Sequence, residues 1–147
     1  MKTDTGAPKA VILSGLLITA ILLTSGCPQQ GPGLEGTLWT LDSYVDSGGN
    51  LVSVMVDTEI TAQFQEGTIQ GNGGCNSYSA DYHITGNSIT IGAITRTLMY
   101  CTTPGGIMDQ EDAYFAALAS AVNFEIKGTS MEMTDSSGKV ILVFKVA

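Results

Sequence analysis

The chain has 147 residues, with 14 acidic and 6 basic side chains and therefore a formal net charge of −8. This length fits one domain with an appendage but not two full domains. The excess of acidic residues argues against binding to nucleic acid and against adsorption to anionic membranes, because both contacts need a basic surface.

Residues 1–26 have the pattern of a secretory signal peptide. Lys2 and Lys9 form a short basic region, and residues 11–23 are a mostly apolar run. This run is shorter than the about 20 apolar residues of a transmembrane helix. It leads into Thr24-Ser25-Gly26-Cys27, which resembles a lipobox, the sequence in which the cysteine thiol takes a diacylglyceryl group. The alternatives are an ordinary signal peptide beside a stray cysteine and an uncleaved short anchor.

Residues 27–33 predict a tether between the lipid and a folded domain at residues 34–147. Proline, glycine and glutamine dominate the segment, and it has no apolar side chain after the cysteine. Such a composition is typical of a flexible linker. We therefore expect lipidation of Cys27, contact with the membrane through lipid, and a domain in the cell envelope outside the cytoplasm.

Two cysteines remain once Cys27 is assigned to lipid. They are Cys75 and Cys101. An even number of cysteines in an oxidising compartment predicts a disulfide, here between these two. On the chain-entropy model, closing residues 75–101 into a loop stabilises the fold by roughly 3–4 kcal/mol. The alternative is a reactive thiol at one of the two positions.

Most of the mature chain alternates apolar and polar residues. The alternating segments are residues 39–45, 58–64, 78–84, 122–127, 131–134 and 140–146. In the first of them we expect Trp39, Leu41 and Val45 to share the buried face, and in the last Val140, Leu142, Phe144 and Val146. Glycine-rich turns separate the segments, at residues 46–50, 66–67, 86–87 and 135–138. The pattern indicates half-buried antiparallel strands joined in a meander.

One segment, residues 109–121, predicts a helix. Asp109, Glu111 and Asp112 fall in its expected first turn, where the helix dipole favours negative charge. We expect its apolar face to cover the sheet, a face formed by Tyr114, Phe115, Leu118 and Val122.

The titratable residues do not form a recognisable catalytic or metal site. His83 is the only histidine and alternates onto a polar strand face. The acidic candidates are explained by the helix start, turns and strand ends, and the loop at residues 42–50 lacks the spacing of a calcium loop. We therefore expect no enzyme activity, no metal and no cofactor.

The most specific motif is Gly71-Asn72-Gly73-Gly74-Cys75-Asn76-Ser77-Tyr78. So many glycines indicate a bulge or a close approach of two backbone segments. The motif is then a rigid corner of the fold, or alternatively the floor of a binding site.

Several separated motifs resemble one family. Gly74-Cys75-Asn76-x-Tyr78, the hairpin at residues 82–91, Thr97-x-Met99-x-Cys101 and the helix with Glu111 and Phe115 are similar to the META domain of HslJ-like proteins. The start, Gly36-Thr37-x-Trp39, and the last hairpin, Asp135-x-x-Gly138, match as well. Two positions depart from the family pattern: Ala80 replaces a glycine, and Leu98 replaces a basic residue that precedes Met99.

The resemblance implies an α+β fold in which an antiparallel β-sheet, a partly barrel-like meander, packs with a single α-helix. It also implies an envelope protein linked to stress, drug tolerance, secretion or motility, with the cysteines as a structural pair and no catalytic residues to carry over. The motif residues Gly74, Asn76, Tyr78 and Tyr82 become the family signature and the candidate binding residues.

The expected function is that of a non-enzymatic META lipoprotein, acting as a binding or stress-protective module of the envelope. The alternatives are an inhibitor of an extracytoplasmic hydrolase, with residues 102–106 as the inhibitory loop, and a carrier of a small apolar ligand between sheet and helix. The expected partner is an envelope protein or a small ligand but no nucleic acid, and the expected state is a monomer.

Overall fold

The computed structural model describes residue 1 and residues 32–147. The predictions for the signal peptide, for lipidation of Cys27 and for most of the tether concern residues outside this range. Within it the chain forms ten strands and one helix. In chain order these are β1 (Leu38–Val45), β2 (Leu51–Ser53), β3 (Thr61–Gln65), β4 (Thr68–Asn72), β5 (Ser77–Thr85), β6 (Ser88–Ile91), β7 (Thr95–Arg96), α1 (Ile107–Ser120), β8 (Asn123–Lys127), β9 (Ser130–Thr134) and β10 (Val140–Val146).

Eight of the strands close into an antiparallel barrel. The order around it is β10, β9, β8, β6, β5, β4, β3 and β1, and pairing of β1 with β10 closes the ring. The two short strands lie outside this ring, since β2 pairs with β1 and β7 with β5. The predicted α+β class and antiparallel sheet are therefore confirmed, and the meander is closed on itself.

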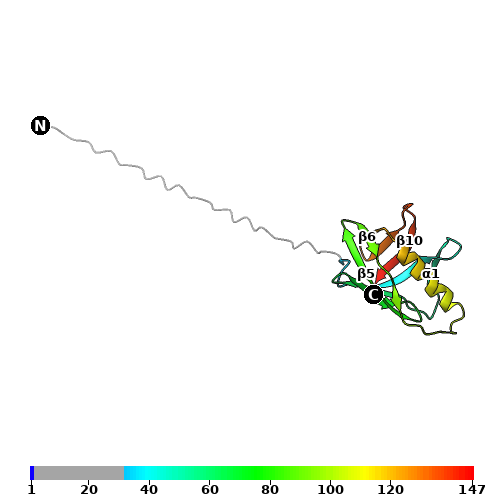
Figure 1. Ribbon diagram of the computed structural model, residues 1–147. Coiled ribbons are helices and arrows are strands. Elements are labelled where there is room, and N and C mark those ends of the chain that lie inside the picture. The colour runs from blue at the N-terminus through cyan, green and yellow to red at the C-terminus, as the bar shows by residue number, and fades with distance from the viewer. Residues whose placement is uncertain (2–31) are drawn as a thin grey trace.

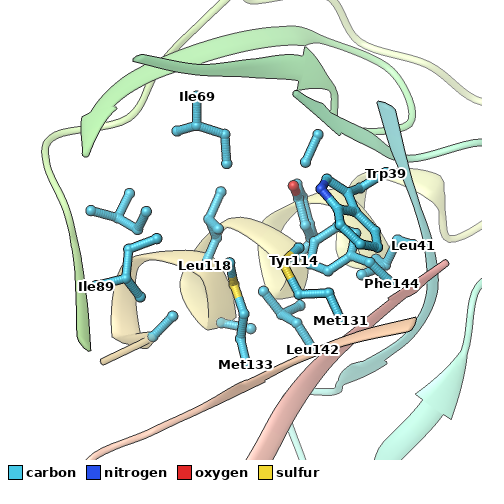
Figure 2. Packing of buried hydrophobic residues seen from close by; sticks show 14 of the residues in the cluster. Trp39, Leu41, Ile69, Ile89, Tyr114, Leu118, Met131, Met133, Leu142 and Phe144 are labelled. Atoms are coloured by element: carbon cyan, nitrogen blue, oxygen red, sulfur yellow. The ribbon is translucent and has the colours of Figure 1, made fainter. Parts of the chain in front are cut away.

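Helix α1 and the barrel enclose one apolar core. The helix packs against β1, β6 and β10, and Figure 2 shows Tyr114 and Leu118 pointing from it into the space between the strands. Both side chains are fully buried. Strand side chains fill the rest of the interior, among them Trp39, Phe64, Ile69, Met131, Met133, Leu142 and Phe144.

Strand β1 departs from the predicted alternation at its end. Trp39 and Leu41 are buried as expected, but Tyr44 takes the third inward position and Val45 is only half-buried. The pairing with β10 shifts register between Leu41 and Ser43. Such a bulge adds one residue to one strand and reverses which side chains face inward beyond it, so the prediction for Val45 was wrong.

Strand β10 contains a second bulge, between Val140 and Leu142 in its pairing with β9. Ile141 and Leu142 are both buried, while Val140 is half-buried and Val146 is exposed at the strand end. Strict alternation held only for the middle of this strand.

The helix begins two residues earlier than predicted, at Ile107, after Gly106 in a left-handed conformation (φ 94°). Only Asp109 lies in the first turn. The prediction that Glu111 and Asp112 lie in the first turn was therefore wrong, and the side chain of Glu111 is instead fully buried. The helix ends at Ser120, so Val122 belongs to the following extended segment rather than to the helical face.

The turn predictions are confirmed where glycines and one glutamate adopt positive φ. Glu66 and Gly67 (φ 50° and 81°) join β3 to β4, Gly86 (φ 62°) joins β5 to β6, and Gly138 (φ 83°) joins β9 to β10. These conformations match the right-handed twist of tight hairpins.

Candidate functional site

The glycine motif forms the corner between β4 and β5. A Cβ atom added at Gly71 would lie 2.0 Å from the carbonyl oxygen of Thr61, and one added at Gly73 would lie 2.6 Å from Cζ of Phe115. The predicted close approach of backbone segments is thus observed. It presses the corner against β3 on one side and against α1 on the other.

Glu111 of α1 lies directly beneath this corner. Its Oε2 accepts hydrogen bonds from the backbone N–H of Cys75 (3.0 Å) and of Asn76 (2.6 Å). Its Oε1 accepts one from the side-chain amide of Asn76 (2.7 Å) and lies 3.5 Å from the Arg96 guanidinium. A buried carboxylate is costly unless its oxygens are paired, and here the corner and Arg96 provide the partners.

Asn76 connects the corner to the segment before the second cysteine. It is only 2% exposed. Its Oδ1 accepts hydrogen bonds from the Thr97 hydroxyl and the Met99 N–H, both at 2.7 Å. Its Nδ2 donates to the Met99 carbonyl at 3.1 Å as well as to Glu111. Two acceptor and two donor positions are all that a side-chain amide has, so Asn76 is fully engaged within the fold.

Cys75 and Cys101 form a disulfide, with their Cα atoms 5.9 Å apart. The predicted pairing is confirmed, and the reactive-thiol alternative is wrong because neither residue has a free thiol. The bond places Cys101 beside the corner, two residues after Met99, which Asn76 holds.

Around these two attachments the chain carries an exposed apolar segment, which we call the apex loop (residues 97–101). Leu98, Met99 and Tyr100 are 92%, 61% and 81% exposed. The loop is held through its backbone, since the Thr97 N–H donates to the Ser77 carbonyl (3.1 Å) and Met99 bonds to Asn76. Its large side chains therefore contribute little to the core and are presented to solvent on a fixed backbone.

A protruding loop was expected on the other side of Cys101, at residues 102–106. Thr102, Thr103, Gly105 and Gly106 are indeed exposed, but this segment carries no large apolar side chain. The signal that could have identified the apex loop was three consecutive apolar residues immediately before a paired cysteine, with Leu98 at a position where the family has a basic residue.

The two candidate tyrosines lie inside the fold rather than at its surface. The hydroxyl of Tyr78 lies 2.6 Å from that of Tyr114 and donates to the Thr61 carbonyl (3.0 Å). Burial raises the pKa of both phenols. Tyr82 is separate, near the other end of β5, and donates to Glu35; burial, together with that carboxylate, raises its pKa to about 12. The structure thus brings Gly74, Asn76 and Tyr78 together, but not Tyr82.

The comparisons with known proteins identify the family. The family model described as META domain matches residues 32–147. The chain belongs to the META domain family. Comparison with curated proteins finds no match.

Two solved structures are similar to this META domain. An NMR structure of a protein from Burkholderia xenovorans is 25% identical, with a TM-score of 0.62, covering 78% of this chain and 83% of the other. A second NMR structure is 19% identical, with a TM-score of 0.54, covering 75% of this chain and 88% of the other, and supports the fold alone.

In this META domain the residues first considered for chemistry are dispersed. His83 is exposed on β5, and Asp46 accepts hydrogen bonds from Asn50 in the β1–β2 turn. Asp42 forms an ion pair with Lys145. Hydrogen bonds from Lys145 and Ser43 lower the pKa of the Asp42 carboxyl. Across residues 32–147 no group of three or more His, Cys, Asp or Glu side chains could hold a metal ion. Within the same residues no helix has the length and apolar character of a membrane span.

A surface pocket of about 540 Å³ lies between α1 and the β1–β2 turn. Its lining includes Val45, Ala113, Ala116 and Ala117, with Asp46, Asp109 and Asp112 also contributing. Neither Tyr114 nor Phe115 lines this pocket, whereas a carrier would need its cavity beneath these two residues.

The apex loop and the start of the domain lie at opposite ends of the barrel. Glu35 contacts Tyr82 and pairs with Phe64, near the β3–β4 turn, whereas the loop adjoins Ser77 at the start of β5. Five residues of strand separate Ser77 from Tyr82, roughly 16 Å. In Figure 1 the chain enters the domain on the left, and the yellow-green to yellow segment before α1 lies at the lower right.

Proposed function

We propose that this chain is a non-enzymatic, lipid-anchored META-domain protein of the cell envelope, and that its apex loop binds a partner protein. One observation carries the proposal: Leu98, Met99 and Tyr100 are exposed side by side on a backbone that a buried asparagine and a disulfide hold in place. Any stress-protective role then proceeds through binding rather than through chemistry.

An exposed apolar cluster gains free energy when a partner covers it. Large apolar side chains in water gain about 25 cal/mol per Å² when they are buried. Association also costs the ordering of loops and side chains, and a backbone fixed in advance avoids part of that cost. The apex loop meets both conditions, since its side chains are exposed and Met99 is fixed by Asn76 on both its N–H and its carbonyl.

The polar groups beneath the loop support binding rather than catalysis. Glu111 and Asn76 are buried, and their side-chain oxygen and nitrogen atoms form hydrogen bonds within the fold. A general base or a nucleophile would have to reach a substrate atom at hydrogen-bond distance, and these side chains are covered by the corner. We propose that they position the loop.

The arrangement of the two ends fits a lipid anchor at Cys27. The described chain enters the barrel beside Glu35 and Tyr82, at the end opposite the apex loop. A tether attached at that end holds the domain on the membrane with the loop directed away from it. The loop is then accessible to proteins of the same compartment.

The carrier alternative has less support. Its ligand would occupy the space between sheet and helix, and that space is filled by Tyr114, Leu118 and the barrel side chains around them. The hydrolase-inhibitor alternative is compatible with the exposed apex loop.

The first test is intact mass and detergent partitioning of the protein from its host. We expect a mass equal to residues 27–147 plus acyl chains, in the detergent phase. An unmodified mass in the soluble fraction would contradict the anchor.

The second test is photo-crosslinking in living cells from position 100, with Thr90 as the matched control. Thr90 is exposed on β6, away from the loop. We expect a cross-linked protein band from position 100 that is absent from position 90 and is lost with Leu98→Asp. Identical band patterns from both positions would contradict a binding role for the loop.

A further inference from the structure

We infer that the apex loop occupies the substrate cleft of an extracytoplasmic serine endopeptidase with a deep apolar primary pocket, with Tyr100 in that pocket. The loop then acts as a substrate-like inhibitor. The inference rests on the proposed function, because it names the class of protein that the loop binds.

The backbone of the loop leaves alternate groups available to such a cleft. Thr97 and Met99 direct their backbone groups toward Ser77 and Asn76. Residues 97–100 contain neither helix nor turn, and the backbone groups of Leu98 and Tyr100 alternate along the chain with those that are bonded. Within the described residues these groups of Leu98 and Tyr100 make no hydrogen bond. Extended peptides bind to other proteins by pairing such free backbone groups with a strand of the partner.

The side chains fit the same cleft. Tyr100 is 81% exposed and aromatic, and chymotrypsin-like peptidases select large apolar side chains in a hydrophobic primary pocket. Leu98 lies two residues earlier in the same segment. Residues 97–108 contain no charged side chain, so insertion buries no unpaired charge.

The attachment of the loop explains why it would inhibit rather than be consumed. On one side of the Tyr100–Cys101 peptide bond, Tyr100 follows Met99, which Asn76 holds through two hydrogen bonds. The residue after the bond is Cys101, which Cys75 holds through the disulfide. Two adjacent residues of one rigid corner thus fix both sides of the bond.

Hydrolysis of that bond would consume one water molecule and leave a carboxylate on Tyr100 and an amino group on Cys101. Neither end could diffuse away, because Asn76 and the disulfide retain them. A reacting pair held together has a very high effective concentration, so the bond can reform and the cleft stays occupied. An ordinary substrate instead releases its amine product and frees the enzyme.

The test uses the full chain, purified in detergent with its disulfide intact, against chymotrypsin and trypsin with chromogenic peptide substrates. We expect inhibition of chymotrypsin and none of trypsin, whose primary pocket selects basic residues. Tyr100→Ala should weaken inhibition on the order of 100-fold, as loss of a central anchor residue does. Tyr100→Lys should transfer inhibition to trypsin.

The matched control is Val56→Ala. Val56 is 83% exposed, close to Tyr100 in exposure, and follows Met55, which binds Gln110 of α1. This variant should inhibit chymotrypsin as strongly as the unsubstituted chain. Equal weakening by both variants would mean that the effect is nonspecific apolar adhesion and would overturn the inference.

Two further outcomes would overturn it. One is no inhibition of chymotrypsin. The other is cleavage after Tyr100 at the rate of an unstructured peptide. The proposed function would survive either outcome if crosslinking from position 100 still captured an envelope protein. Conversely, inhibition of chymotrypsin without any crosslink in cells would count against the proposed function alone.

Discussion

The carboxylate of Glu111 lies 2.6 Å from the backbone nitrogen of Asn76, and 35 residues of chain separate the two. Through this contact the helix fixes the corner between β4 and β5, and through the Asn76 side chain the corner fixes Met99. A buried polar network whose members are all satisfied is rigid and specifies one arrangement. The exposed apex loop therefore depends on a carboxylate that is itself inaccessible.

The first prediction concerns that carboxylate. Glu111→Gln replaces one accepting oxygen with a donor that faces N–H groups, so it should lower the free energy of unfolding by about 2–3 kcal/mol. Urea unfolding followed by circular dichroism measures this. The control is Asp112→Asn, which removes a 62% exposed carboxylate paired with Arg96 and should cost less than about 1 kcal/mol. Equal losses for both variants would contradict a structural role for Glu111.

The second prediction concerns Asn76. Asn76→Asp keeps the oxygen that accepts from Thr97 and Met99 but loses the donor to Met99 and places a second carboxylate 2.7 Å from Glu111. It should destabilise the fold at neutral pH at least as much as Asn76→Ala, by about 2–4 kcal/mol. Both variants should make the apex loop susceptible to limited proteolysis.

The control for Asn76 is Asn87→Ala. Asn87 is exposed in the β5–β6 turn and donates a long hydrogen bond of 3.3 Å to Phe124. This variant should leave the protease sensitivity of the apex loop unchanged, as mapped by mass spectrometry of the fragments. A loop that stays resistant in Asn76→Ala would show that the disulfide alone fixes it.

The sequence was informative where one face of a strand is buried. Alternation identified the buried rows of β3, β5 and β9, such as Ala62 with Phe64, and Met131 with Met133. It failed beyond the β1 bulge, because a one-residue register shift arises from pairing with a distant strand and leaves no local signal. Barrel closure, through pairing of β1 with β10, is likewise a long-range property.

The site was only partly predictable for a related reason. Two cysteines, with an oxidising compartment expected from the N-terminal sequence, were enough to predict the disulfide. The role of Glu111 was not, because three acidic residues near a helix start have a sufficient local explanation. Only the packing of α1 against the corner shows that one of them is buried. Sequence patterns report local preferences, and the partners of a buried charge come from elsewhere in the chain.

The third prediction concerns alkaline pH. The folded-state pKa of Tyr82 is raised from 10.0 to about 12, and burial shifts Tyr78 and Tyr114 in the same direction. A raised phenol pKa contributes stability that is complete below the unfolded pKa and is lost as pH rises toward the folded one. The free energy of unfolding should therefore fall between pH 10 and pH 12.

Urea unfolding at a series of alkaline pH values measures this loss. Tyr82→Phe removes one of the contributing groups, so its unfolding free energy should depend less steeply on pH in that range. The stability difference between the two proteins should shrink as pH rises, because only the unsubstituted protein must keep a phenol protonated beside Glu35. Parallel pH profiles would contradict the assignment.

The fourth prediction concerns the close approach at Gly71. In Gly71→Ala the new Cβ would lie 2.0 Å from the Thr61 carbonyl oxygen. The clash is with backbone, which also accepts the Tyr78 hydrogen bond, so neither strand can move aside without disrupting that contact. We expect the free energy of unfolding to fall by about 2–4 kcal/mol, within the range of severe single substitutions, as measured by thermal and urea unfolding.

Gly105→Ala is the matched control, because its added Cβ would meet no heavy atom within 4 Å. It should change the free energy of unfolding by less than about 0.5 kcal/mol. If both alanines were equally tolerated, the corner would have to be free to shift, and Asn76 could not hold the apex loop as described.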